Sequence, residues 1–258
     1  MHKQMSKTLG QDVDDFIWNL RWRGHDIIKS RVAKYGIQCD LKHGHLHAAM
    51  KPVHMNELNA SYEEAVRRGM GDQVTLLDAQ GVRNHLQSDL YCGAIKNTRN
   101  MHLHPLNLCI GEAKAAESLG ALIFEHSEVL DIVHGANPAV ITAQGRVEAK
   151  QVMLAGDVYH KLERKQLKGM IFPAMGGIVT TKPLGELAKQ LNPQDLAVYD
   201  CRFVLDYYRM TADGRLLFGG GANYSGRDSR DIAAELRPCI ERTFPALKGV
   251  EIDFQWSC

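Results

Sequence analysis

Three histidines alternate in the segment HGHLH at residues 43–47. On a strand, side chains two residues apart project to the same face. Imidazole clusters bind zinc and other transition metals, and His102 and His104 could add ligands. Strand neighbours at i and i+2 lie roughly 6.6 Å apart, and no Asp or Glu stands at the spacing of a known zinc motif. Two interpretations stay open: a His-cluster metal-dependent hydrolase, or histidines that line a strand. We assign no metal ligands.

A second chemical feature is the segment DYYR at residues 206–209. If it is a strand, Tyr207 and Arg209 share one face, and Asp206 and Tyr208 share the other. A tyrosine and an arginine on one face could hold a substrate carboxylate through charge-assisted hydrogen bonds. An ordinary amphipathic strand has the same pattern. This reasoning identifies no catalytic residue.

Three glycines follow at positions 219–221. They are not a dinucleotide-binding fingerprint, because GxGxxG needs a third glycine where Tyr224 stands. Either the backbone here approaches a flat ligand closely, or the strand bends or bulges. No P-loop, GxSxG, HExxH or EF-hand pattern occurs in the chain.

The elements that position these residues begin with a helix that should end at Gly36. An extended run at 39–50 and a weaker helix at 56–68 follow. The first helix is indicated by apolar residues at i, i+3, i+4 and i+7: Val13, Phe16, Ile17 and Leu20.

The middle of the chain predicts a helix that starts at Pro105, since a proline suits the first helical position. Gly120 should end this helix, and a buried strand should follow at 121–124. The apolar face of the helix consists of Leu106, Cys109, Ile110, Ala113 and Ala116. Three further strands are expected at 129–133, 139–143 and 151–155.

The last hundred residues predict a strand at 176–181, a short helix after Pro183, and a hairpin. The hairpin joins 203–210 to 215–219 through a turn that contains Asp213-Gly214. A helix at 232–244 should bend or break at Pro238. Alternating apolar residues at 250–256 predict a final strand with one buried face.

Length and composition are those of an ordinary globular chain. It has 258 residues, of which 45% are hydrophobic and 24% charged, enough for a sizeable core. The net charge of +1 gives no support to a nucleic-acid or anionic-membrane partner. No apolar run approaches the ~18 residues of a membrane helix, and the start does not read as a signal peptide. Six cysteines without a CxxC pair predict reduced thiols, mostly in the core, and a cytoplasmic protein.

Six segments together resemble a known family. They are the extended Cys39-Asp40 strand followed by Met50, HLHPLNL at 102–108 with IGEA at 110–113, SEVLDI at 127–132, VMLAG at 152–156, DYYRMTADGRLLFGGG at 206–221, and TFPALKG at 243–249. Their order and spacing resemble the FAD-dependent amino-acid and amine oxidases of the D-amino-acid oxidase superfamily. The resemblance extends over essentially the whole chain.

The resemblance implies a mixed α/β (α+β) fold. It consists of a partial FAD/NAD(P)-binding layer and a largely antiparallel substrate-domain sheet with helices on one side. The expected division is a helical segment at 1–36, substrate-domain parts at 37–104 and 161–258, and the partial FAD layer at 105–160.

The resemblance also implies an FAD cofactor and an amine or amino-acid substrate. In such enzymes hydride leaves the carbon that bears the amine, and the resulting imine hydrolyses. The backbone at Val129 resembles the adenine contact, and Ala155 and Gly156 resemble a strand end close to the ADP portion. The implied substrate-binding residues are Tyr207, Arg209 and Tyr224.

Family members open with a strand–GxGxxG–helix unit and continue beyond the segment that here reads Trp256-Ser257-Cys258. We therefore expect a central fragment that self-associates or binds a complementary chain. The expected function is oxidation of a C–N bond in a small amine such as a gamma-glutamylated polyamine. The alternatives are a non-catalytic remnant or partner-dependent subunit, and the metal-dependent hydrolase.

Overall fold

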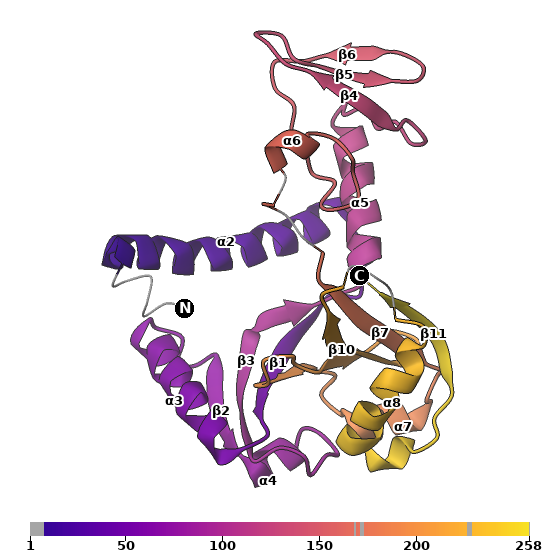
Figure 1. The fold of residues 1–258 in the computed structure, drawn as a ribbon. Coiled ribbons are helices and arrows are strands. Elements are labelled where there is room, and N and C mark those ends of the chain that lie inside the picture. Colours follow the sequence, from indigo (N-terminus) through magenta and orange to yellow (C-terminus); the bar gives the residue numbers. More distant parts are fainter. Residues whose placement is uncertain (1–7, 168, 171–172, 226–228, 258) are drawn as a thin grey trace.

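The structure is a computed structural model that describes residues 8–257 apart from 168, 171–172 and 226–228 (Figure 1). Cys258 and the first seven residues of the expected helical segment lie outside the described residues. The four-part domain division stays a prediction.

An eight-stranded sheet forms the main body, in the order β11-β7-β10-β9-β8-β1-β3-β2. Only the β1–β8 pair is parallel among these neighbours, which confirms the largely antiparallel sheet. Its strands are β1 (Lys42–Ala49), β2 (Val74–Asp78), β3 (Gly93–His102), β7 (Met175–Thr181), β8 (Ala197–Asp200), β9 (Tyr207–Met210), β10 (Leu216–Asn223) and β11 (Ile252–Ser257).

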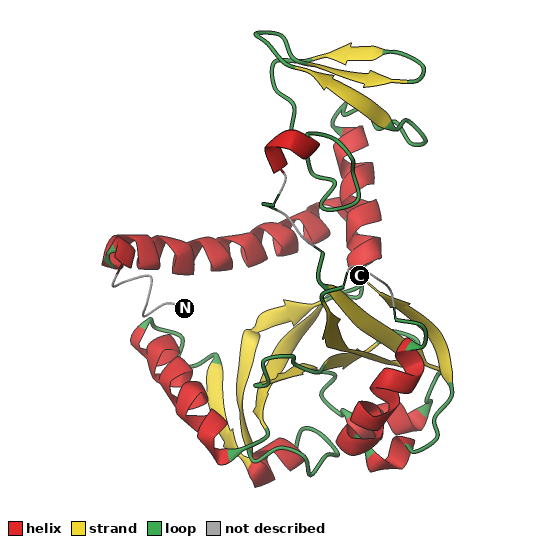
Figure 2. Cartoon of the chain, viewed as in Figure 1, coloured by secondary structure: helices red, strands yellow, loops and turns green. Residues whose placement is uncertain are grey.

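Helices cover one face of this sheet (Figure 2). The buried core there joins strand residues to the helices, with Tyr208 stacked on Phe218 and edge-on to Phe244. Full burial of such side chains stabilises the fold by roughly 1.5–3 kcal/mol each. The covering elements are α4 (Ala79–Arg83), α7 (Glu186–Leu191), α8 (Ile232–Thr243) and η1 (Pro245–Leu247).

The helix α8 runs without a break through Pro238, where the sequence predicts a bend or break. A proline inside a helix removes one backbone hydrogen bond and crowds the preceding turn. Here Leu236 and Ile240 are buried in the core on either side of it, and Asp231 caps the first turn by accepting from the backbone N–H of Ala234. Packing and capping outweigh the local penalty.

On the other face of the sheet, α3 (Pro52–Arg67) packs against the β1–β3 end. The helix α2 (Gln11–Tyr35) lies above α3 in Figure 1. It ends at Gly36, which has the left-handed conformation, as the sequence predicts. Trp22 is the apolar side chain that α2 buries against this end. The apolar stripe that predicts the helix is itself largely exposed at Phe16 and Leu20.

A second sheet of three strands follows α5 (Pro105–Ser118). Its strands are β4 (Val129–Val133), β5 (Ala139–Thr142) and β6 (Arg146–Glu148), and α6 (Arg164–Leu167) comes after them. The third strand therefore lies at 146–148, and the expected strand at 151–155 is a loop. The expected buried strand at 121–124 is also an exposed loop, in which Leu122 is 80% exposed. Both segments contain apolar residues, but the described residues supply no layer that buries them.

The final strand β11 lies at the edge of the sheet, beside β7. The expected buried face is wrong for Phe254 and Trp256, which are exposed. A register shift between Ile252 and Phe254 interrupts the alternation, and Arg215 stacks on the Phe254 ring instead.

One buried ion cluster fastens the start of α2 to the end of α3. Arg68 lies 2.5 Å from Asp14 and 2.9 Å from Asp15, also contacts Glu64, and stacks on the Trp18 ring at 4.7 Å. The side chains of Asp14 and Arg68 are only 4% and 8% exposed. Removal of one partner of a buried pair leaves an uncompensated charge.

We predict that Arg68→Met lowers the free energy of unfolding by about 3–5 kcal/mol, because Asp14 loses its buried cation. Arg67→Met is the matched control, since Arg67 is exposed and pairs with the same Glu64, and exposed pairs contribute about 0–1 kcal/mol. Urea unfolding of both variants is the measurement. Equal losses would show that the cluster does not hold α2 in place.

Candidate functional site

The sheet face opposite α7 and α8 carries a row of half-exposed side chains. The strand register places His47 beside Tyr199, Tyr199 beside Tyr207, and Tyr207 beside Gly219. Gly219 in turn pairs with Ile178 on β7. This row, which we call the open row, combines aromatic, imidazole and apolar surface, as ligand sites commonly do.

Gly219 of the open row and the glycines near it have different surroundings. A Cβ at Gly219 would overlap the ring of Tyr207, and a Cβ at Gly220 would lie 2.7 Å from Asp206. Both close approaches are therefore made by the chain's own side chains. Gly221 has φ +72° beside a register shift, which supports the bulge interpretation there. At Gly176 and Gly221, however, no described atom lies within 4 Å of an added Cβ, so bare backbone faces open space.

Tyr207 and Arg209 share this face, but Arg209 is drawn away from the open row. Only 9% exposed, its guanidinium donates to the carbonyl of Met210 at 3.1 Å and lies 3.9 Å from a carboxylate oxygen of Asp40. Burial lowers the pKa of Arg209. Because the ion pair with Asp40 is long, most N–H donors of Arg209 are left for other acceptors. The contact between Arg209 and a substrate carboxylate stays a prediction.

Tyr224 is exposed and lines a cavity of about 310 Å³ at the end of β10. The same cavity is bordered by Gly176, Gly177, Gly220 and Gly221, and by residues of α8 on its other side: Ile232, Glu235 and Leu236. The structure therefore brings Tyr224 to the bare glycine backbone but not to Arg209. Its predicted contact with a substrate is untested.

Two of the five singled-out histidines stack on Tyr199. The ring of His45 lies 5.3 Å from that of Tyr199 at an interplanar angle of 1°, and the ring of His47 lies 4.3 Å away at 25°. The side-chain amide of Asn100 lies 2.6 Å from His45 Nδ1, and the thiol of Cys201 lies 3.2 Å from His47 Nε2. Burial lowers the pKa of His45 to about 4 and also lowers the pKa of His47.

The other histidines have separate partners. His43 is exposed beyond a register shift, Nε2 of His102 lies 2.8 Å from the carbonyl of Asp195, and His104 caps α5 by accepting from the backbone N–H of Asn107. The described residues contain no group of three or more His, Cys, Asp or Glu side chains that could hold a metal ion. The hydrolase interpretation therefore has no geometric support.

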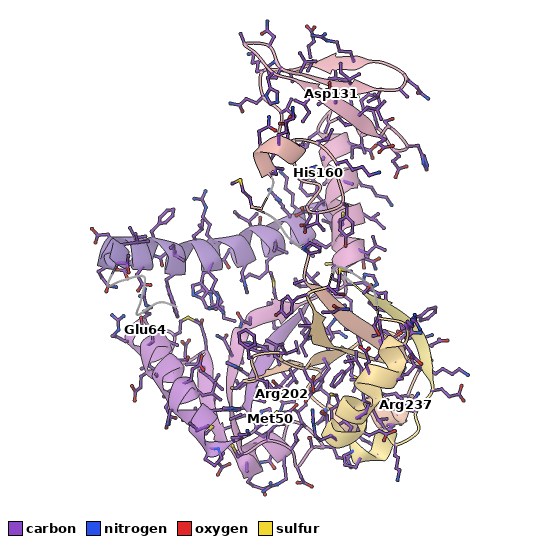
Figure 3. All side chains as sticks on the ribbon, in the orientation of Figure 1. Met50, Glu64, Asp131, His160, Arg202 and Arg237 are labelled. Atoms are coloured by element: carbon purple, nitrogen blue, oxygen red, sulfur yellow. The ribbon has the colours of Figure 1, made fainter. Side chains whose placement is uncertain are left out.

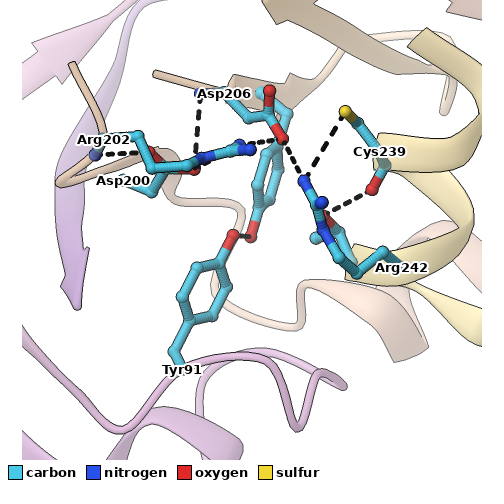
Figure 4. A network of polar contacts seen from close by, with 8 residues as sticks. Tyr91, Asp200, Arg202, Asp206, Cys239 and Arg242 are labelled. Atoms are coloured by element: carbon cyan, nitrogen blue, oxygen red, sulfur yellow. Dashed lines mark hydrogen bonds and ion pairs between the residues drawn. The ribbon is translucent and has the colours of Figure 1, made fainter. Parts of the chain in front are cut away.

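A polar network that the sequence did not reveal positions the start of β9 (Figure 4). Arg202 donates to Asp200 at 2.7 and 2.9 Å and also pairs with Asp206, which Arg242 approaches at 3.3 Å. The expected strand at 203–206 is instead a bent loop with Phe203 96% exposed. In the sequence, the only feature that indicates this network is Asp-x-Arg at 200–202, followed four residues later by Asp206.

The family model described as FAD dependent oxidoreductase (DAO) matches residues 3–258. The chain belongs to this family.

Two curated relatives cover nearly all of the chain. Gamma-glutamylputrescine oxidoreductase of Escherichia coli (strain K12) is 40% identical over 98% of this chain and 60% of that protein. Probable oxidoreductase OrdL of Haemophilus influenzae is 35% identical over 97% of this chain and 59% of that protein. The chain thus spans about 60% of the length of these relatives.

Solved structures show the same fold. Glycine oxidase from Geobacillus kaustophilus has a TM-score of 0.75 at 21% identity, covering 92% of this chain and 65% of that one. L-proline dehydrogenase from P. horikoshii has a TM-score of 0.75 at 17% identity, covering 91% and 64%. Both confirm the mixed α/β fold class that the sequence predicts.

The residues expected to contact FAD lie on the other sheet and the loop that follows it. Val129 is half-buried in β4, whereas Ala155 and Gly156 are exposed in a loop and not at a strand end. The ring of His160 would lie 3.0 Å from a Cβ at Gly156, so this side chain takes the close approach. Figure 3 shows His160 and Asp131 of β4 well away from Arg202 and the main sheet. Their FAD contacts stay predictions.

Five cysteines within the described part of the chain are free thiols, as expected. Cys39 is buried, Cys92, Cys201 and Cys239 are partly buried and pack against the core clusters, and Cys109 is exposed. None of the helices that the structure describes is long and apolar enough to cross a membrane.

We predict that His45 makes the fold sensitive to acid. Its pKa is near 6.5 when the chain is unfolded and about 4 when folded, so below pH 6.5 the unfolded chain binds a proton that the folded chain does not. Stability therefore falls as the pH falls, by about 2 kcal/mol at pH 5 from this group.

His45→Gln should remove this group's share of the loss of unfolding free energy between pH 7.5 and pH 5. Urea unfolding at the two pH values is the measurement. Exposed His43→Gln is the control and should leave the loss unchanged. An unchanged pH dependence in His45→Gln would show that this imidazole does not stay neutral in the folded chain.

Proposed function

We propose that this chain is the substrate-domain sheet and part of the FAD-binding layer of an oxidoreductase that oxidises a C–N bond of a small amine. The observation that carries the proposal is the open row beside bare glycine backbone, in a chain that belongs to the FAD-dependent oxidoreductase family. The opposite face of the same sheet is packed beneath α7 and α8, apart from the cavity that Tyr224 shares with residues of α8.

The residues present fit a flat cofactor ring at one place. Gly176 and Gly221 leave space where any other residue would place a Cβ, and the ring of Tyr207 lies against Gly219, two residues before Gly221. FAD, when bound, would supply the acceptor for the hydride that leaves the carbon bearing the amine. For its ADP portion we propose Val129, Ala155 and Gly156, as the family resemblance implies.

The open row would orient the substrate. Tyr207 presents an aromatic ring that attracts an ammonium group, whereas the ring of Tyr199 is stacked with His45 and His47. His45 and His47 remain neutral at physiological pH because burial lowers their pKa values, so they do not repel such a cation. Tyr207, Arg209 and Tyr224 stay the proposed substrate-binding residues.

We propose a gamma-glutamylated polyamine as the substrate, on the strength of the 40% identical E. coli protein named for gamma-glutamylputrescine. A cytoplasmic location is proposed from the free thiols. The competing candidate is a non-catalytic remnant or partner-dependent subunit. Exposed apolar surface on α5 and the loop after it supports this second candidate.

The first test is flavin binding by the whole chain. We expect the purified chain to take up FAD, to show flavin absorbance in the visible range, and to lose it when an amine is added without oxygen. Gly176→Ala should weaken FAD binding roughly tenfold, because the added methyl group occupies the open space.

Gly24→Ala is the control, since an added Cβ there also meets nothing within 4 Å but lies on α2. A chain that stays colourless after mixing with FAD would remove the oxidoreductase proposal for this chain and leave the remnant. Equal FAD binding by both variants would show that the ring does not lie at Gly176.

The second test concerns self-association or a complementary chain. Exposed apolar side chains lie on α5 and in the loop after it, where Ile110 also lines a groove of about 480 Å³ between Ile37 and α5. An edge strand such as β11 can also recruit another chain. The exposed side chains on α5 and in that loop are Leu106, Ile110, Leu119, Leu122, Ile123 and Phe124.

We expect concentration-dependent oligomers in size-exclusion chromatography with light scattering. Phe124→Lys should reduce them without loss of stability, because this side chain is exposed in the single chain. Phe203→Lys is the control on the distant exposed loop. A monomer that binds no hydrophobic dye would contradict the proposal.

A further inference from the structure

An exposed apolar seam runs along α2 on the side that faces away from the main sheet. It consists of Val13, Phe16, Leu20 and Ile27, which are 37%, 63%, 50% and 38% exposed. Trp22, which packs with the β1–β3 end of the sheet, lies on the opposite side of the helix, because 3.6 residues make one turn. The seam is therefore apolar surface that the core of the chain does not use.

The spacing of the seam is that of a two-helix coiled coil. Residues 13, 16, 20, 23 and 27 alternate steps of three and four, the heptad pattern whose side chains interlock with those of a partner helix. Arg23 interrupts the apolar series, but the aliphatic stem of an arginine covers apolar surface while its charge stays in water.

Gly24 borders the seam inside the helix. Glycine destabilises a helix interior relative to alanine, and no described atom lies within 4 Å of a Cβ added here. Nothing in the single chain therefore requires a glycine at this position. The bare backbone lets a side chain of a partner helix approach closely.

The charges beside the seam complement one another when the helix is turned end for end. Asp12 and Arg23 lie on the same edge of the seam, are both exposed, and have no ion-pair partner among the described residues. Asp12 stands six residues before position 18, and Arg23 stands five residues after it. At about 1.5 Å per residue, an antiparallel copy centred on position 18 brings each Asp12 level with an Arg23 of the other helix, to within roughly 2 Å along the axis.

We infer that α2 pairs with α2 of a second copy of this chain, antiparallel and about a two-fold axis at position 18. Phe16 then packs against Leu20 of the second copy, and Val13 packs on the stem of its Arg23, whose guanidinium binds Asp12. A two-fold interface is self-complementary, so each contact occurs twice. A parallel pair would instead place Asp12 beside Asp12 and Arg23 beside Arg23, where like charges repel.

This pairing is separate from the association proposed for α5 and the loop after it. The seam ends before Arg31, which lies 3.1 Å from Glu112 of α5. A contact over two heptads is small beside a standard interface of about 1,200–2,000 Å², so we expect a dimer with a Kd in roughly the micromolar range. The inference depends neither on the proposed reaction nor on bound FAD.

The test is sedimentation equilibrium of the whole chain carrying Phe124→Lys, which disrupts the apolar surface of the loop after α5. We expect a monomer–dimer equilibrium. Leu20→Lys should raise the Kd about tenfold or more, because it places a charge at the centre of the seam. Arg83→Asp changes an exposed arginine on α4 and is the control that should leave the Kd unchanged. Thermal melts check that each variant folds.

Charge reversal tests the direction of the pairing. Asp12→Arg and Arg23→Asp should each raise the Kd about tenfold, because each places like charges side by side at two symmetric positions. The double variant should return to within about threefold of the parent Kd, since it recreates both ion pairs in reverse. An equimolar mixture of the two single variants should dimerise for the same reason.

A chain that stays monomeric above micromolar concentration in the Phe124→Lys background would overturn the inference and leave the proposal for α5 standing. Loss of the dimer in Leu20→Lys without any effect of the charge reversals would overturn the antiparallel arrangement. A double variant that folds but stays as weak as the single variants would overturn it too. Oligomers that Leu20→Lys abolishes and Phe124→Lys does not reduce would support the α2 pair and contradict the proposal for α5.

Discussion

The unequal burial of the two faces of the eight-stranded sheet is the constraint on which the rest of the structure depends. One face carries Leu46, Val179, Tyr208 and Phe218, all buried against α8 and its neighbours. Because side chains alternate along a strand, this choice sends Tyr199 and Tyr207 to the opposite face. The site is therefore a consequence of core packing: the residues available for a ligand are those that the core does not use.

Polar clusters then set the details that hydrophobic burial leaves free. Asp200 and Asp206 hold Arg202 across the turn between β8 and β9, which fixes where Tyr207 begins its strand. Arg68 does the same for α2 by joining it to α3. Each cluster contains a charge that would be costly if left alone in the protein interior, so its geometry is well determined.

The two sheets differ in how completely the chain buries them. The main sheet has a continuous core, whereas β4–β6 and α5 bury little more than Ala115, Ile132 and Ala139. Since the relatives are longer than this chain, their additional residues are available to cover such surface in those proteins. This contrast connects the exposed apolar surface with the proposals of a cofactor-binding layer and of association with another chain.

Local chemistry was readable from the sequence by itself. Gly36 ends α2, Pro105 starts α5, and Asp213-Gly214 joins β9 to β10, because a left-handed residue, a missing N–H and a tight turn each depend on a few neighbouring residues. The family resemblance added the sheet class, since it carries long-range order that spacing alone does not.

Only the tertiary structure decided what surrounds each side chain. The strand expected at 151–155 and the buried run at 121–124 failed because burial needs a partner layer, which no local pattern specifies. The stacking of His45 on Tyr199 and a cavity beside Trp22 join residues more than 70 positions apart in the sequence. A side chain's exposure and pKa are properties of such distant neighbours, so the sequence determined the elements, and their packing determined the site.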